Sequence, residues 1–281
     1  MPNIAIVSLL PSTTEICYAL GLDAHLRGVT HECDYPAAAR RLPRLTRNVL
    51  PDSEYSSADI DRLITERVLN GQSIYALDRD LMAELAPDLV LTQALCDVCA
   101  VAYDDVLAVA RTLPKIPHVA SFEPRSVGEI LDSIDEIARL ASVPECGAAV
   151  VGALRARLEI VAERVADATP PRVLCLEWLD PPMVGGHWVP EMVALAGGVD
   201  VLGPLGAPSV RVTWAAIAEA DPHIILLMPC GYDLPITLER AHELDDIMGW
   251  RTLAAVRRGH VHAVDGSSYF NRSGPRVIRE R

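Results

Sequence analysis

Apolar residues recur along this chain in short continuous runs, which alternate with longer stretches of helical spacing. The continuous runs predict strands near 3–9, 26–30, 116–120, 172–177 and 260–264. The helical spacing predicts helices near 57–69, 101–113, 126–142, 190–197, 236–245 and 247–256. Residues 43–56 carry neither pattern and are expected to form a loop. Strands that alternate with helices in this way are typical of an α/β protein.

One short pattern occurs twice, once in each half of the chain. Residues 86–96 read Ala-Pro-Asp-Leu-Val-Leu-Thr-Gln-Ala-Leu-Cys, and residues 221–230 read Asp-Pro-His-Ile-Ile-Leu-Leu-Met-Pro-Cys. Each copy follows a predicted helix, at 77–85 or at 213–220. Upstream of the copies, Glu15 and Glu191 are each followed by a glycine six residues later. The repetition predicts two similar α/β lobes, and a cleft between lobes is where a small ligand usually binds.

A long helix is expected between the two halves. Pro144 opens a stretch of helical spacing over 145–168, which would be about 35 Å long at the usual rise per residue. The expected organisation is an N-terminal lobe over 1–124, a helical segment over 125–170 and a C-terminal lobe over 171–281. The predicted fold is therefore two Rossmann-like lobes joined by one long α-helix, with the ligand cleft between the lobes.

Charge and composition exclude several classes of function. The chain has 281 residues and a formal net charge of −13, which disfavours nucleic acid as a partner. No apolar run reaches the roughly 20 residues that span a bilayer, so membrane insertion is not expected. The first residues lead straight into a strand without a secretory signal. This favours a cytoplasmic protein, or a periplasmic or cell-surface protein whose leader has been removed.

Polar residues gather where predicted strands end. The predicted strand at 26–30 is followed directly by His31, Glu32, Cys33, Asp34 and Tyr35. In open α/β sheets, ligands bind at the carboxyl ends of the strands. Ser12 and Glu15, three residues apart after the first strand, have the spacing of a capping box at a helix start.

The cysteines are open to several interpretations. Seven cysteines is an odd number, which fits reduced thiols better than a disulfide framework. Cys96 and Cys99 could pack and line the ligand cleft, bind a metal ion together with His31, or act as a redox pair. The sequence pattern favours the first interpretation and leaves the metal site and the redox pair as alternatives.

Large aromatic residues are concentrated in the second half. Trp178, Trp188, Trp214 and Tyr232, with His187 beside them, suggest a flat and largely apolar surface for a ligand. No phosphate-binding glycine motif, nucleophile elbow or zinc-protease motif is present in the sequence. No catalytic residue is therefore predicted, and a binding protein is expected rather than an enzyme.

Several segments resemble the cobalamin-binding, vitamin B12-uptake branch of the substrate-binding proteins of ABC transporters. The resemblance covers essentially the whole chain and is carried by residues 8–15, 30–36, 91–93, 96–101, 185–191 and 228–232. It implies two α/β lobes joined by a long helix, a corrinoid ligand held between the lobes, no required cofactor and an ABC permease as partner.

The resemblance also implies a set of ligand-binding positions. In the first lobe these are His31, Glu32, Asp34, Tyr35, Gln93 and Cys96. In the second lobe they are Trp178, His187, Trp188, Cys230, Gly231, Tyr232, Tyr269, Phe270 and Asn271. Members that couple to transport present an acidic residue on each lobe to the permease. The matching positions are Asp80, which is acidic, and Ala215, which is not, so permease coupling is expected to be weak.

The function expected from the sequence is binding of cobalamin or a related corrinoid. Two alternatives stay open at this point. One is a receptor for a metal ion, haem or another metal chelate, using His31, Cys96 and Cys99 in the case of a bare metal. The other is a cytoplasmic corrinoid-handling protein or enzyme built on the same fold.

Overall fold

A computed structural model describes residues 4–50, 55–70, 72–94 and 102–278. The chain forms two compact units. Unit 1 comprises Met1–Glu54, Arg62–Glu123 and Leu131–Gly152, and unit 2 comprises Tyr55–Asp61, Pro124–Ile130 and Ala153–Arg281.

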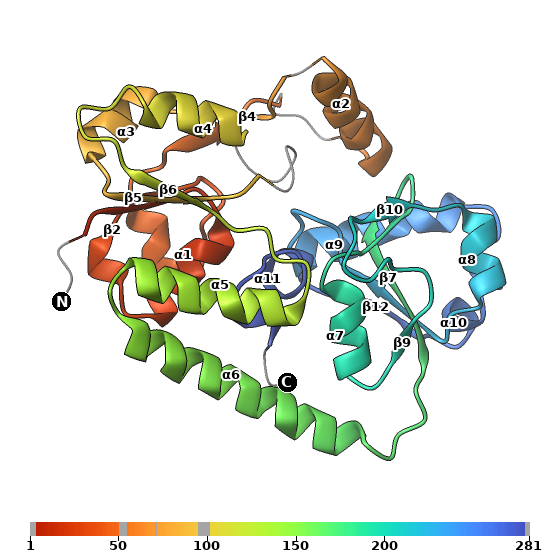
Figure 1. Ribbon diagram of the computed structural model, residues 1–281. Helices are drawn as coiled ribbons and strands as arrows, with labels where there is room; N and C mark the ends of the chain where they lie inside the picture. Colours follow the sequence, from red (N-terminus) through yellow and green to blue (C-terminus); the bar gives the residue numbers. More distant parts are fainter. Residues whose placement is uncertain (1–3, 51–54, 71, 95–101, 279–281) are drawn as a thin grey trace. The chain divides into compact units, whose positions relative to one another are not determined.

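Unit 1 is built on a parallel sheet in the order β2-β1-β5-β6. Its strands are β1 (Ile6–Ser8), β2 (Leu26–Val29), β5 (Leu89–Thr92) and β6 (His118–Ser121). Helices α3 and α4 lie on one side of this sheet, and α1 and α5 lie on the other (Figure 1). These helices are α1 (Pro11–Ala19), α3 (Arg79–Leu85), α4 (Tyr103–Ala110) and α5 (Val127–Leu140), which belongs to unit 1 from Leu131 onward.

Apolar packing holds both faces of this sheet. On one face Val7 and Val90 pack in a buried cluster with Met82 of α3 and Val106 of α4. Ile134, on α5, is also fully buried. Strands covered on both faces read as continuous apolar runs, which is why the sequence pattern predicted them.

A small sheet in unit 1 was not expected from the sequence. Strand β3 (Thr46–Asn48) pairs antiparallel with β4 (Tyr75–Leu77). The prediction of a loop over 43–56 is therefore wrong at β3. The strand is short and carries Arg47 and Asn48, so it has no apolar run, and it exists because of its pairing with a distant segment.

The start of α1 also differs from the prediction. The N-cap residue is Leu10, which makes no side-chain capping bond, and Pro11 occupies the first turn. The predicted capping box of Ser12 and Glu15 is therefore wrong. Proline fits this position because the first backbone N–H groups of a helix have no partner within the helix.

Unit 2 has a mixed sheet in the order β10-β8-β7-β11-β12, with β9 also paired to β7. Strands β7, β11 and β12 run parallel, and β8 and β10 are antiparallel neighbours. The strands are β7 (Arg172–Trp178), β8 (Met183–Val184), β9 (Val199–Asp200), β10 (Val210–Arg211), β11 (Ile224–Leu227) and β12 (Val261–Ala263). The helices are α7 (Val189–Leu195), α8 (Trp214–Ala220), α9 (Leu234–Arg240), α10 (Ala254–Arg257) and α11 (Gly266–Tyr269).

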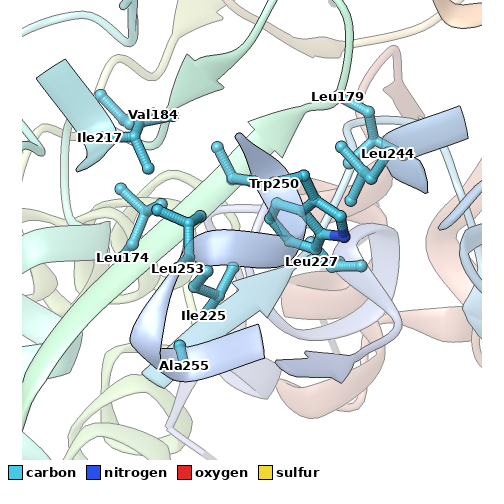
Figure 2. Close-up of a cluster of buried hydrophobic side chains, with 11 residues drawn as sticks. Leu174, Leu179, Val184, Ile217, Ile225, Leu227, Leu244, Trp250, Leu253 and Ala255 are labelled. Carbon is cyan, nitrogen blue, oxygen red and sulfur yellow. The ribbon is translucent and has the colours of Figure 1, made fainter. Parts of the chain in front are cut away.

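One face of the unit 2 sheet is covered by a large apolar cluster (Figure 2). Ile225 and Leu227 of β11 pack there with Ile217 of α8 and with Trp250. Trp214 packs against the same cluster, and its ring meets that of Trp250 edge-on with centroids 5.8 Å apart. Trp214 was expected to help form a ligand surface, and this expectation is wrong because its ring supports the core.

The repeat seen in the sequence is confirmed in the structure. Asp78 caps α3 by accepting from the backbone N–H of Leu81, and Thr213 caps α8 in the same way. Both helices end at a residue with a left-handed backbone, Ala86 or Asp221, and a proline and a buried strand follow. The same capping residues, left-handed helix end and proline therefore accompany the same helix–strand pair in each unit.

The long helix α6 (Pro144–Val165) confirms the predicted helix after Pro144, although it ends three residues earlier. Helix α2 (Ser57–Leu69) has the predicted bounds. The predicted helix at 247–256 is confirmed only at its C-terminal end by α10; before it, Gly249 has a φ of 89° and a short 3-10 turn over Trp250–Thr252 interrupts the helix. The 3-10 segments are η1 (Asp23–His25), η2 (Ala37–Arg41), η3 (Ala241–Asp246), η4 (Trp250–Thr252) and η5 (Pro275–Val277). The predicted fold class is confirmed.

Candidate functional site

In unit 1 the polar residues of interest follow the carboxyl ends of parallel strands. His31 and Glu32 come just after β2, and Gln93 comes just after β5. Parallel strands end at the same edge of a sheet, so these residues share the edge where ligands bind in open α/β sheets. His31, Glu32 and Gln93 are all half-buried.

His31 is held in place by Thr46 of β3. The Thr46 Oγ1 accepts from the His31 backbone N–H at 3.0 Å and lies 2.7 Å from His31 Nδ1. Thr46 Oγ1 is also 2.7 Å from the hydroxyl of Thr30. Arg44 fixes the backbone of this loop by donating to the carbonyls of Thr30 and Cys33 at 2.6 Å and 2.8 Å.

Tyr75 of β4 supports the same pair of residues from another side. Its ring centroid is 5.2 Å from that of His31, and its hydroxyl donates to Glu32 Oε1 at 2.8 Å. Burial is the main influence on the pKa of His31 and lowers it; Glu32 acts to raise this pKa, and Arg44 acts to lower it. We call His31, Glu32, Thr46 and Tyr75 the His31 cluster.

The other expected positions of unit 1 lie near the His31 cluster in sequence. The carbonyl of Asp34 accepts from Arg40 Nε at 3.1 Å, and Tyr35 is 47% exposed. Cys96 and Cys99 lie outside the described residues. Their role as cleft-lining thiols or metal ligands therefore stays a prediction.

In unit 2 an aromatic pair stands at the carboxyl ends of two adjacent parallel strands. Trp178 ends β7, Tyr232 follows β11, and their ring centroids are 5.4 Å apart. The Trp178 indole N–H donates to the carbonyls of Ser57 and Asp180, each at 3.1 Å. Both rings are half-buried. We call Trp178 and Tyr232 the aromatic pair.

The segment that contains Tyr269, Phe270 and Asn271 packs onto the same edge of the sheet. Trp188 is buried and donates its indole N–H to the Phe270 carbonyl at 2.8 Å. Asn271 Nδ2 donates to the Met228 carbonyl at 3.2 Å. The guanidinium of Arg276 lies 5.8 Å from the ring centre of Tyr269. Cys230 is half-buried and Gly231 is exposed, beside the aromatic pair in sequence.

His187 adopts an unusual backbone conformation in a tightly held loop. Its φ is 50°, a left-handed value that is uncommon for a residue other than glycine. Its backbone N–H donates to the Ala207 carbonyl at 2.7 Å, and its carbonyl accepts from the Gly206 backbone N–H at 3.0 Å. The ring lies beside Trp188 with centroids 5.7 Å apart, and Nε2 is buried without a hydrogen-bond partner among the described residues. Burial is the main cause that lowers the pKa of His187.

Two half-buried acidic residues, Glu177 and Asp200, bond to neighbouring segments of unit 2. Ser209 donates its hydroxyl to Glu177 and accepts from the Gly186 backbone N–H at 3.0 Å. Burial raises the pKa of Glu177, although the Ser209 hydroxyl opposes this shift. Burial also raises the pKa of Asp200, whose Oδ1 accepts from the backbone N–H groups of Leu202 and Gly203.

These shifts predict a stability that depends on pH. A carboxyl group with a raised pKa in the folded state stabilises the fold most below its unfolded pKa, and this contribution is lost as pH rises through the folded value. We therefore expect Glu177→Gln to gain unfolding free energy relative to the parent chain as pH rises from about 5 to 8. Urea unfolding at both pH values measures the difference. Glu163→Gln, at an exposed position of α6, is the control. If the difference in unfolding free energy between Glu177→Gln and the parent chain is the same at both pH values, the raised pKa of Glu177 is contradicted.

The expected permease-docking positions occupy equivalent places in the two units. Asp80 is the second residue of α3 and Ala215 is the second residue of α8, and both are exposed. Ala215 lines a shallow apolar pocket with Trp214, Ala218, Met248, Gly249 and Leu253. Met248 is 95% exposed.

The described part of the chain offers neither a metal site nor a membrane-spanning helix. No group of three or more histidine, cysteine, aspartate or glutamate residues there is arranged to hold a metal ion. None of the helices described has both the length and the apolar character that crossing a bilayer requires.

Sequence reasoning did not identify the residues that position the expected site. Thr46 and Tyr75 come from β3 and β4, and Ser209 precedes the short strand β10. These strands have two or three residues each, so no periodic pattern could reveal them. The only local signal was the presence of hydroxyl groups in segments that otherwise resemble loops.

Comparison with known proteins gives a consistent result. The family model described as "Periplasmic binding protein" matches residues 6–267. The vitamin B12-binding protein of Vibrio cholerae serotype O1 is 24% identical over 288 residues, which cover 99% of this chain and 86% of that protein. The resemblance seen in the sequence is thereby confirmed.

Solved structures show the same fold. The periplasmic vitamin B12 binding protein BtuF of Vibrio cholerae superposes with a TM-score of 0.68 at 23% identity, covering 99% of this chain and 93% of that one. The periplasmic heme binding protein HutB of Vibrio cholerae superposes with a TM-score of 0.72 at 17% identity, covering 98% and 95%.

Proposed function

The chain belongs to the periplasmic binding protein family, and on that basis we propose that it binds cobalamin or a related corrinoid for an ABC importer. The aromatic pair of unit 2 and the His31 cluster of unit 1 are the ligand-binding surfaces proposed for each unit. The chain's own contribution is binding and orientation of the ligand, and no catalytic step is proposed.

The observation that carries this proposal is the aromatic pair. Trp178 and Tyr232 place two half-buried rings side by side at the carboxyl edge of the sheet. A corrin is a broad ring with apolar faces, and aromatic side chains provide large contact areas at a small cost in conformational entropy.

Polar groups nearby suit the edge of the same ligand. A corrin carries amide side chains around its rim, which both donate and accept hydrogen bonds. His187 Nε2 and Asn271 Oδ1 are buried and have no hydrogen-bond partner among the described residues. Buried polar groups usually have a partner, and amide groups of a bound ligand would supply one.

The test is titration of the purified chain with cyanocobalamin, with cobinamide and with haem. Binding is measured by calorimetry and by the ligand absorbance that the protein retains after desalting. Saturable binding of either corrinoid is the expected result. Binding of haem without binding of a corrinoid would favour the haem alternative, which the heme-binding relatives of the same fold suggest. Absence of binding to any corrinoid would overturn the proposal.

The same experiment separates the bare-metal alternative. A metal receptor that uses Cys96, Cys99 and His31 would hold stoichiometric metal in elemental analysis and would bind no corrinoid. The relatives named above are periplasmic proteins, which supports a periplasmic location for this chain.

Coupling to a permease is expected to be weak in this chain. Asp80 offers a carboxylate on α3, whereas the equivalent position on α8 is Ala215 in an apolar surface. Charge pairs at an interface mainly govern encounter rate and register. We expect Ala215→Glu, exported with a secretion signal, to increase corrinoid uptake with the permease encoded nearest to it. Ala218→Glu on the same helix is the control, and full uptake by the unaltered exported chain would contradict the assignment.

A further inference from the structure

We propose that His31 coordinates the metal at the centre of the bound corrinoid through Nε2, and that Thr46 is the residue that positions its ring for this role. The inference rests on the proposed function, because it concerns how the same ligand is held. It adds a direct bond from the chain to the metal.

The orientation of the imidazole is the first argument. Nδ1 lies 2.7 Å from Thr46 Oγ1, and the ring is supported by Tyr75 with centroids 5.2 Å apart. Nε2 forms no hydrogen bond with any residue of the described ranges. A histidine that ligates a metal through one nitrogen commonly donates the other ring N–H to a neighbouring group, which fixes the tautomer and the ring orientation.

The hydrogen bonds at Thr46 allow the required tautomer. A hydroxyl donates one hydrogen bond and accepts two. With the imidazole proton on Nδ1, Thr46 Oγ1 accepts from the backbone N–H of His31 at 3.0 Å and from Nδ1–H at 2.7 Å, and it donates to Thr30 Oγ1 at 2.7 Å. This arrangement satisfies the hydroxyl completely and leaves the lone pair of His31 Nε2 available to a metal.

The surroundings hold the imidazole against rotation. Arg44 anchors the backbone on both sides of His31 through the carbonyls of Thr30 and Cys33. Tyr75 is itself held by its hydrogen bond to Glu32 Oε1 at 2.8 Å. The cluster is therefore preorganised, which a single coordinating side chain requires if it is to bind without reordering its neighbours.

One histidine is sufficient for this kind of ligand. The ring nitrogens of a corrin fill the equatorial positions of cobalt, so the protein needs to supply only an axial donor. Imidazole nitrogen is a suitable donor for a metal of this type. The ligand class is a corrinoid whose axial position can exchange, such as an aquo form or a form that lacks its lower base.

The experiment uses cob(II)inamide, which has no lower-base nitrogen, bound to the full chain under anaerobic conditions. The expected electron paramagnetic resonance spectrum shows each cobalt line split into a triplet by one axial ¹⁴N. Chain labelled with ¹⁵N-histidine should convert the triplet into a doublet. This labelled sample tests the inference without any substitution.

Variants identify the residue and its support. His31→Gln should lose the splitting, whereas His118→Gln, at the opposite edge of the same sheet, should keep it. Thr46→Val should weaken or broaden the splitting, and Thr46→Ser, which keeps a hydroxyl, should restore it. Thermal unfolding of each variant verifies that it is folded.

The outcomes separate this inference from the proposed function. Binding of cob(II)inamide without nitrogen splitting would overturn coordination by His31 and leave corrinoid binding intact. Splitting that survives in His31→Gln would assign coordination to another residue and overturn the inference. Unchanged splitting in Thr46→Val would overturn the role of Thr46. Failure to bind any corrinoid would overturn the proposed function, and this inference with it.

Discussion

Tyr232→Ala is expected to lower the affinity for a corrinoid about tenfold to a hundredfold, equivalent to roughly 1–3 kcal/mol. The Tyr232 ring forms half of the aromatic pair and is only half-buried in the unliganded chain. Its truncation removes apolar contact area from the ligand and leaves Trp178 without its neighbour. Calorimetric titration with cyanocobalamin measures the change.

Two controls make this result specific. Tyr232→Phe keeps the ring and should bind nearly as well as the parent chain. Met248→Ala removes an apolar side chain that is 95% exposed on the same unit, and it should not alter affinity. If Tyr232→Ala binds as tightly as the parent chain while remaining folded, the aromatic pair does not cover the corrin.

Gly186→Ala is expected to destabilise the protein by roughly 1–3 kcal/mol or more. A Cβ atom at this position would lie 2.3 Å from the Ala207 carbonyl oxygen and 2.7 Å from backbone atoms of Pro208 and Ser209. Backbone atoms cannot rotate away as the end of a flexible side chain can. The loop that holds His187 would therefore have to shift, and ligand affinity should fall together with stability.

Gly152→Ala is the matched control for this substitution. Gly152 lies within α6, and a Cβ atom there would meet no atom within 4 Å beyond its chain neighbours and the nearby backbone of its own helix. Alanine is favoured over glycine inside a helix by about 0.5–1 kcal/mol, so this variant should be neutral or slightly more stable. Urea unfolding compares the two, and equal stability of Gly186→Ala and the parent chain would show that the 186–187 loop moves freely.

Much of the architecture could be predicted because it depends on local patterns. The buried strands β1, β5 and β11 are continuous apolar runs, and a run of this kind is visible in the sequence whatever it packs against. The α3–β5 and α8–β11 repeat was visible for the same reason, since each copy carries its own cap, proline and strand.

The candidate site could be predicted only in part. The position of His31 after β2 followed from the rule that ligands bind at the carboxyl ends of parallel strands. The partners of His31 could not be predicted, because Thr46 and Tyr75 belong to short strands that pair with each other. Trp214 was expected on a ligand surface because the large aromatic residues are concentrated in the second half of the chain, and its packing against Trp250 has no local signal.

By itself the sequence determined the α/β class, the repeated units, the long helix and the family, since these depend on periodicity, on capping residues and on motifs in a fixed order. The tertiary structure alone decided which side chains meet: Thr46 with His31, Trp178 with Tyr232, and Ser209 with Glu177. Each of these pairs joins residues separated by many positions along the chain. Their contact depends on strand pairing and on burial. Both are set by the fold of the whole chain, so a short window of sequence does not reveal them.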